Sequence, residues 1–129
     1  MLHLNEIVII SGKVSEETDH SRDLEQFLIT NNLHYKEVVG VYKGEEERSF
    51  LVVLPYNDYL NTMIDLGKVL KQECILYSSA MRESELIYQD GKREYIGQLV
   101  PVYKEEAMKQ DCYTYAPDLN KYYITKKLK

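Results

Sequence analysis

Arg48-Ser49-Phe50-Leu51-Val52-Val53-Leu54 is the stretch that decides the predicted fold. It ends in five consecutive apolar residues, and a short run rich in β-branched and aromatic side chains is typical of a buried strand. Just before it, residues 35–42 alternate with a two-residue period, and the turn Lys43-Gly44-Glu45-Glu46 separates the two stretches. The pattern therefore predicts a β-hairpin.

Further strands and helices are predicted on both sides of this hairpin. Residues 7–10 are an apolar run followed by a turn, which indicates a buried strand, and residues 24–31 have apolar side chains at helical spacing. Residues 59–70 carry a wide apolar stripe that predicts a second helix, and residues 72–77 predict a fourth strand. The order β-α-β-β-α-β is that of ferredoxin-like folds.

We therefore expect an α+β, ferredoxin-like core over residues 5–78. The first and third strands are the most continuously apolar and belong at the centre of the sheet, whereas the second, more polar strand is expected at an edge. Two helices cover only one face of such a sheet. The other face must be covered by the rest of the chain or by another subunit.

Residues 79–129 are predicted to form a tyrosine-rich C-terminal extension of the same domain. Residues 86–88 and 95–100 flank the tight-turn signal Asp90-Gly91, which predicts a β-hairpin. Residues 105–110 have the pattern of one or two helical turns. The whole chain of 129 residues is expected to be a single domain, since one core usually spans about 100–200 residues.

Composition and charge restrict the functional classes. Apolar residues make up 44% and charged residues 29%, which is typical of a soluble globular protein, and the net charge of −5 argues against general nucleic-acid binding. The longest apolar runs are far too short to cross a membrane, and no secretory signal is evident. Cys74 and Cys112 form no metal or redox motif, and the three histidines are scattered. We expect reduced cysteines, a cytoplasmic location (the host cytoplasm if the chain is viral), no metal and no cofactor.

Three stretches resemble an uncharacterised family of bacterial and phage domains of unknown function. They are Ser21-Arg22-Asp23-Leu24, the strand Glu47-Arg48-Ser49-Phe50-Leu51-Val52 and the strand Gln72-Glu73-Cys74-Ile75-Leu76-Tyr77. The first matches the family's polar start of a helix, the second its Glu-x-Ser-Phe-Leu-Val strand and the third its Gln-initiated strand. The resemblance covers residues 5–90 and implies an α/β domain of microbial or viral source. It implies no reaction, because the family has no established activity.

Polar residues of these stretches are the candidate ligand-binding residues. Arg22, Glu47, Ser49 and Gln72 would form a small polar pocket at one end of the sheet; the alternative is a buried Arg–Glu pair, with the glutamine satisfying backbone groups. His20, beside Ser21, is a further candidate, but the sequence lacks the second motif of a two-histidine phosphoesterase. No catalytic residue is predicted.

Tyrosine is over-represented, with 12 residues against 2 phenylalanines and no tryptophan. Seven of the tyrosines follow residue 80, and tyrosine is enriched at protein interfaces. Some of these rings could instead cover the open sheet face within one chain. The predicted interface residues are Tyr88, Tyr95, Tyr113, Tyr115, Tyr122 and Tyr123.

These observations favour a small, non-enzymatic interaction protein encoded by a phage or mobile element. It would form a dimer or larger homo-oligomer and inhibit or modulate a host protein, with inhibition of a host defence system as its most specific form. The alternative is a protein that binds or processes a small nucleotide, using Arg22, His20 and the tyrosines. A nucleotide released from the denatured protein would favour that alternative.

Overall fold

The computed structural model describes residues 5–127, which form eight β-strands and three α-helices. Their bounds follow in chain order: β1 Ile7–Ser11, α1 Ser21–Thr30, β2 His34–Tyr42, β3 Glu45–Val53, α2 Tyr59–Val69, β4 Cys74–Ser78, β5 Glu83–Tyr88, β6 Arg93–Val102, α3 Lys104–Ala107, β7 Tyr113–Ala116 and β8 Lys121–Lys126. Within this described range, no helix is long and apolar enough to cross a membrane.

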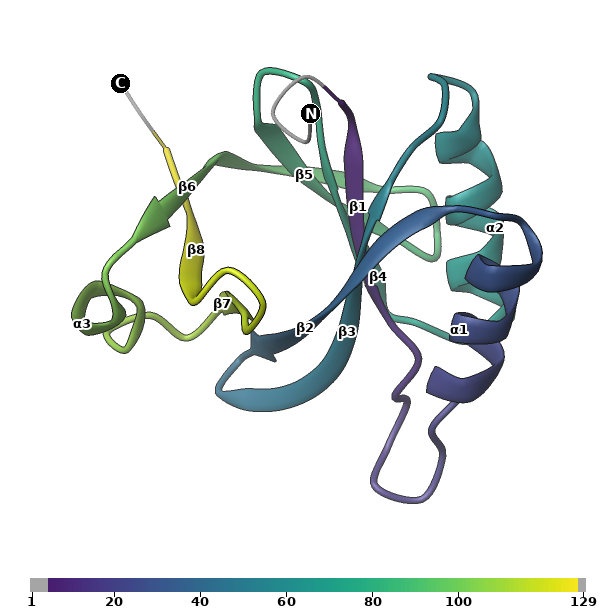
Figure 1. The fold of residues 1–129 in the computed structure, drawn as a ribbon, viewed down its shortest axis with the longest axis horizontal. Coiled ribbons are helices and arrows are strands. Elements are labelled where there is room, and N and C mark those ends of the chain that lie inside the picture. The colour runs from purple at the N-terminus through teal and green to yellow at the C-terminus, as the bar shows by residue number, and fades with distance from the viewer. Residues whose placement is uncertain (1–4, 128–129) are drawn as a thin grey trace.

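The strands form a closed barrel in the order β1-β3-β2-β7-β8-β6-β5-β4, and all neighbours are antiparallel. Figure 1 shows α1 and α2 together on one side of the barrel, next to β1 and β4. The short helix α3 lies on the opposite side and packs against β8. The barrel therefore has one wall covered by two helices and another covered by a single helical turn.

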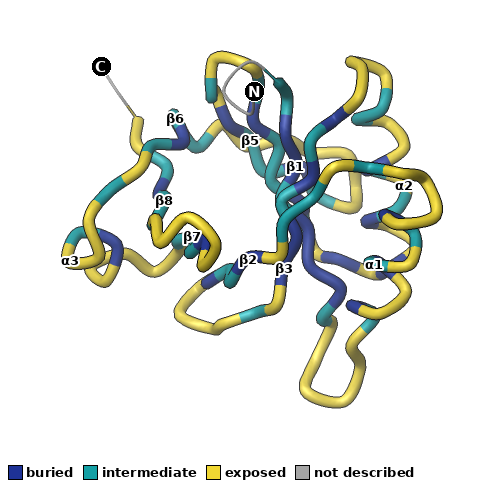
Figure 2. The backbone as a smooth tube through the Cα atoms, in the orientation of Figure 1, coloured by how far each residue is buried: buried dark blue, intermediate teal, exposed yellow. Residues whose placement is uncertain are grey.

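The hydrophobic core lies between helices α1 and α2 and the outer face of the barrel. Alternate residues of a strand face opposite sides, so one set from β1 and β3 packs outward against the helices. Figure 2 shows these buried segments side by side. The fully or almost fully buried members of the core are Val8, Ile10, Leu24, Leu28, Phe50, Val52, Leu54 and Met63.

The other residues of the same strands face the interior of the barrel. On β1, Ile9 and Ser11 line an internal cavity while Val8 and Ile10 belong to the core outside. On β4, Leu76 faces the cavity and Ile75 the helices. This arrangement explains why these strands carry apolar side chains on both faces.

Gly97 marks the point where β6 bends to follow the barrel wall. Its φ is +103°, a backbone conformation that favours glycine, and the register between β5 and β6 shifts beside it. A Cβ at this position would lie 2.3 Å from the carbonyl carbon of Lys126, so the backbones of β6 and β8 meet closely here. The seam between these two strands therefore depends on the absence of a side chain.

The predicted ferredoxin-like fold is wrong, although the order of the first six elements was predicted correctly. The sheet does not end at the predicted edge strand, because Val39–Val41 of β2 pair with Tyr113–Tyr115 of β7. At its other end β4 pairs with β5, and β8 joins β6. Residues 79–127 thus supply four strands that continue the sheet and close it. The sequence predicted only a hairpin and one or two helical turns there, and the turns correspond to α3.

Candidate active site

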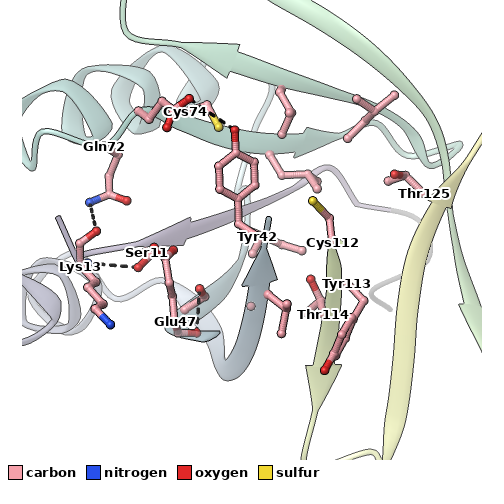
Figure 3. A pocket seen from close by; sticks show the side chains of 18 of the residues that line it. Ser11, Lys13, Tyr42, Glu47, Gln72, Cys74, Cys112, Tyr113, Thr114 and Thr125 are labelled. Atoms are coloured by element: carbon pink, nitrogen blue, oxygen red, sulfur yellow. Dashed lines mark hydrogen bonds between the residues drawn. The ribbon is translucent and has the colours of Figure 1, made fainter. Parts of the chain in front are cut away.

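The barrel encloses a cavity of about 320 Å³ to which all eight strands contribute lining residues. The cavity extends to the end of the barrel where β1 ends and β4 begins, and Figure 3 shows this region from close by. Cavities of roughly 300–1,000 Å³ are usual for small-molecule ligands. Because the outer face of the sheet already holds the hydrophobic core, the interior is free for a ligand.

Apolar and polar residues occupy different parts of the lining. Most of the apolar side chains come from β1, β4, β5 and β6, and these are Ile9, Leu76, Leu86, Ile96 and Leu99. Val14, Val41 and Ile124 are the further apolar residues of the lining. The charged side chains lie near the end of β1, near the start of β3 and in the segment before β4. They are Lys13, Glu47, Lys71 and Glu73. Lys71 and Glu73 are exposed, so the charged part of the lining forms the rim.

Glu47 is a half-buried carboxylate in the wall of the cavity, near the start of β3. Burial raises its pKa above the ordinary value of 4.5, because a carboxylate loses hydration there. The positive charge of Lys13 acts in the opposite direction and lowers this pKa. Figure 3 shows Ser11, Lys13 and Glu47 together on one side of the cavity. A cationic ligand near Glu47 would likewise favour its charged form.

The backbone of Lys13 is held in place by three interactions. Its N–H donates to Ser11 Oγ at 3.1 Å, its carbonyl oxygen accepts from Gln72 Nε2 at 3.3 Å, and the residue forms an isolated bridge with Asp19. Gly12 allows the start of α1 to approach this segment closely, because a Cβ at this position would lie 2.5 Å from the backbone nitrogen of Ser21. The ammonium lies 3.4 Å from Glu16 Oε1, with 25% of the lysine side chain exposed.

Tyr42 and two free thiols, Cys74 and Cys112, also line the cavity. The Tyr42 hydroxyl donates to Glu73 Oε2 at 3.4 Å, and burial raises its pKa. Burial also raises the pKa of the Cys74 thiol to about 11, so this group stays protonated at neutral pH. Cys112 Sγ accepts a hydrogen bond from the Lys43 N–H at 3.5 Å. Neither thiol is in a disulfide bond.

The structure brings together three of the five predicted ligand-binding residues. Glu47, Ser49 and Gln72 all line the cavity. His20 and Arg22 lie at the start of α1 and are not among the described residues that line it, and the Arg22 side chain is exposed. The alternative of a buried Arg22–Glu47 pair is therefore not observed among the described ion pairs, although the Gln72 amide does donate to backbone carbonyls.

The predicted interface tyrosines lie in three environments. Tyr113 and Tyr115 pack against Tyr122, with ring centroids 6.1 Å and 4.5 Å apart. Tyr123 lines the cavity, as does part of Tyr113. The remaining two make local contacts: the hydroxyl of Tyr88 donates to Glu94 at 2.8 Å, and that of Tyr95 donates to Glu83.

Lys13, Tyr42 and Cys74 were missed as site residues, although a two-residue period indicates the first two. Ile9, Ser11 and Lys13 alternate along β1 and its end, and all of them line the cavity. The same period places Tyr42 on the face of β2 that also carries Gly40. These positions become recognisable only when the inner face of the sheet is known to surround a cavity instead of a core.

The comparison with protein families found one match. The model of the S-adenosylmethionine lyase family matches residues 10–126, which run from within β1 to the end of β8. Nearly the whole lining of the cavity falls inside the match. Among curated proteins, none matches the chain. Because the family model covers far more than half of its length, the chain belongs to the S-adenosylmethionine lyase family.

Proposed function

We propose that this protein is an enzyme that binds S-adenosylmethionine in the barrel cavity and cleaves it as a lyase. The observation that carries the proposal is the family match over residues 10–126, which includes the strands that build the cavity. The size and the mixed apolar and charged lining of the cavity support it.

The family match corrects the function predicted from the sequence. A non-enzymatic inhibitor of a host protein is wrong, since the matched family is one of lyases. The alternative, a protein that processes a small nucleotide, fits better, because S-adenosylmethionine contains adenosine. The prediction failed because it relied on the lack of known catalytic motifs, and a cavity lined from eight separate strands leaves no compact motif in the sequence.

The predicted resemblance to a domain family is confirmed only in its coarse form, since the chain does belong to a defined family. A bacterial or phage source remains part of the proposal. So does a cytoplasmic location, which the free thiols of Cys74 and Cys112 support, because reducing compartments keep cysteines unpaired.

The cavity has groups that complement both halves of S-adenosylmethionine. Adenine is a flat, weakly polar ring, and the apolar residues Ile9, Leu76 and Leu86 offer a matching wall. The amino-acid half carries a sulfonium, an ammonium and a carboxylate, and the rim presents charges of both signs. We assign the Glu47 carboxylate to the cationic groups, because it is the less exposed of the two acidic side chains in the lining.

A lyase breaks a carbon–sulfur bond of the sulfonium without adding water. The bonding electron pair leaves with sulfur, which becomes a neutral thioether. The carbon that it leaves is then satisfied from within the same fragment: either the carboxylate of the substrate bonds to it and closes a ring, or the neighbouring carbon gives up a proton to solvent and a double bond forms. The sulfonium loses its charge in this step, so surroundings of low polarity favour the reaction. The apolar side of the cavity provides such surroundings.

The direct test is to incubate the purified protein with S-adenosylmethionine and to identify the products by mass spectrometry. Release of 5′-methylthioadenosine would show cleavage of the bond to the amino-acid chain, whereas release of methionine would show cleavage of the bond to ribose. In water enriched in ¹⁸O, the initial products of a lyase should contain no label. Incorporation of ¹⁸O during cleavage, or no cleavage, would contradict the proposal.

A matched pair of variants tests the role of the cavity. Glu47→Gln should lower kcat/KM by about tenfold or more, because a charged group that contacts a cation contributes roughly 1.5–3 kcal/mol. Glu46→Gln is the control, since Glu46 neighbours Glu47 on β3 but is exposed and does not line the cavity. Equal effects of the two substitutions would show that only the overall charge matters.

A further inference from the structure

The charged lining of the cavity contains equal numbers of acidic and basic side chains. Glu47 and Glu73 are acidic, and Lys13 and Lys71 are basic. A rim that had only to attract a cation would need no lysine. The observed mixture matches a zwitterionic ligand, in which a carboxylate accompanies the positive groups.

Lys13 is the lysine whose side chain is best placed for such a carboxylate. Its side chain is only 25% exposed, and its backbone is fixed by Ser11 and Gln72. The ammonium has an ion-pair partner, Glu16, whose side chain is 88% exposed and follows Lys13 by three residues in the same loop. Solvent and salt weaken a pair of this kind, so Lys13 can exchange Glu16 for a ligand at little cost.

Two other lysines near the cavity are less suited to this role. Lys71 is exposed and lies in the turn that follows α2. Lys43 is 70% exposed, lies 4.0 Å from Glu73 and is positioned over the ring of Tyr42 at 5.1 Å. Lys13 combines the lower exposure with a position in the wall beside Glu47, whose charge it influences.

We propose that Lys13 binds the α-carboxylate of the substrate and thereby selects intact S-adenosylmethionine over its decarboxylated form. This inference rests on the proposed function and specifies how the site recognises its substrate. Lys13 and Glu47 then bind opposite charges of the same amino-acid group, so the substrate is fixed at both ends of that group. The decarboxylated form has no carboxylate to pair with Lys13, so its sulfonium and its ammonium would both lie near the positive charge of this lysine.

The test compares two ligands in the wild type and in Lys13→Met, which keeps an apolar stem and removes the ammonium. The two quantities are kcat/KM for S-adenosylmethionine and the inhibition constant of decarboxylated S-adenosylmethionine as a competitor. We expect kcat/KM to fall about tenfold. The inhibition constant should instead stay within about twofold or fall, because the lysine no longer repels a doubly charged cation.

Two further variants separate recognition from a structural effect. Lys13→Arg keeps the charge and should preserve the discrimination between the two ligands. Lys36→Met is the matched control, because Lys36 is 31% exposed, lies 3.9 Å from the exposed Asp118 and does not line the cavity. It should change neither quantity.

The outcomes distinguish this inference from the proposed function. Suppose that the wild type cleaves S-adenosylmethionine, but Lys13→Met impairs kcat/KM and the binding of the decarboxylated competitor by the same factor, or changes neither. The assignment of Lys13 is then wrong and the proposed function stands. Loss of discrimination in Lys13→Arg would also overturn the assignment. If the wild type neither binds nor cleaves S-adenosylmethionine, the proposed function fails and the assignment fails with it.

Discussion

Glu47 places a carboxylate in a half-buried position of the cavity wall, where burial raises its pKa above 4.5. Below this pKa the side chain is neutral and no longer attracts a cation, so kcat/KM should decline as the pH falls through it. Because kcat/KM reports the free enzyme, the apparent pKa of the acidic limb should lie above 4.5. A profile of kcat/KM against pH measures it, and Glu47→Gln should abolish this limb.

Burial of the Glu47 carboxylate has the opposite pH dependence for stability: the fold should become less stable as the pH rises, whereas kcat/KM should increase. A carboxyl whose pKa is higher in the folded than in the unfolded state makes the fold less stable as the pH rises through the interval between the two values. Glu47→Gln should therefore be more stable than the wild type at about pH 7, and the difference should vanish at about pH 4 and below. Urea denaturation at both pH values checks this. A variant that is less stable at neutral pH would show that the carboxylate makes stabilising contacts.

Among the elements, β6 offers the sharpest test of how the barrel closes. Gly97→Ala would place a Cβ 2.3 Å from the backbone of Lys126 at a φ of +103°, and we expect a loss of at least about 3 kcal/mol in the free energy of unfolding. Gly91→Ala is the control, because Gly91 has a similar φ of +91° but no atom within 4 Å of a new Cβ. It should cost only about 1–2 kcal/mol. Equal losses would show that backbone conformation, not the close contact with β8, limits position 97.

Local elements could be predicted from the sequence, but their long-range pairing could not. The apolar runs and turn signals located β1, the β2–β3 hairpin, both long helices and the β5–β6 hairpin. Strands β7 and β8 were missed, because Tyr113–Ala116 is only four residues long and Lys121–Lys126 is rich in tyrosine and lysine. The pairing of β2 with β7 joins segments about half the chain apart, and local periodicity contains no signal for it.

The residues of the candidate site likewise divide into those that the local sequence could indicate and those that only the folded structure reveals. Glu47, Ser49 and Gln72 were recognisable because they stand at the starts of predicted strands, and the cavity contains them. His20 and Arg22 were grouped with them by sequence resemblance, but α1 lies outside the barrel wall. Lys13 and Tyr42 lie near Glu47 through the β1–β3 and β2–β3 pairings, which agree with the predicted order of strands. Recognising them as site residues required the closed barrel, because only closure turns the inner face of the sheet into a cavity lining.

For the whole molecule, self-association remains a prediction. The barrel itself encloses the sheet face that the sequence left uncovered, so the argument now rests on the cluster of Tyr113, Tyr115 and Tyr122. If a second copy packs on this cluster, light scattering at micromolar concentration should give a mass of about twice 15.2 kDa or more. The double variant Tyr113→Ala, Tyr115→Ala should then have the mass of a monomer, with little change in Tm. A lower Tm without a change in mass would show that the rings stabilise the fold alone.

The closed order of the strands also affects how the chain behaves when it is partly unfolded. Within residues 5–127, each of the eight strands has a neighbour on both sides, so the native barrel presents no complete strand edge to which another chain could add. The parts of β2 and β6 outside residues 39–41 and 98–102 lack a partner on the side of β7 and β8. A longer edge is created when a seam opens, and the apolar strands β1 and β3 lie well away from the β6–β8 seam. Aggregation should therefore depend on how often the barrel opens, and a bound ligand that holds it closed should suppress fibre formation as well as denaturation.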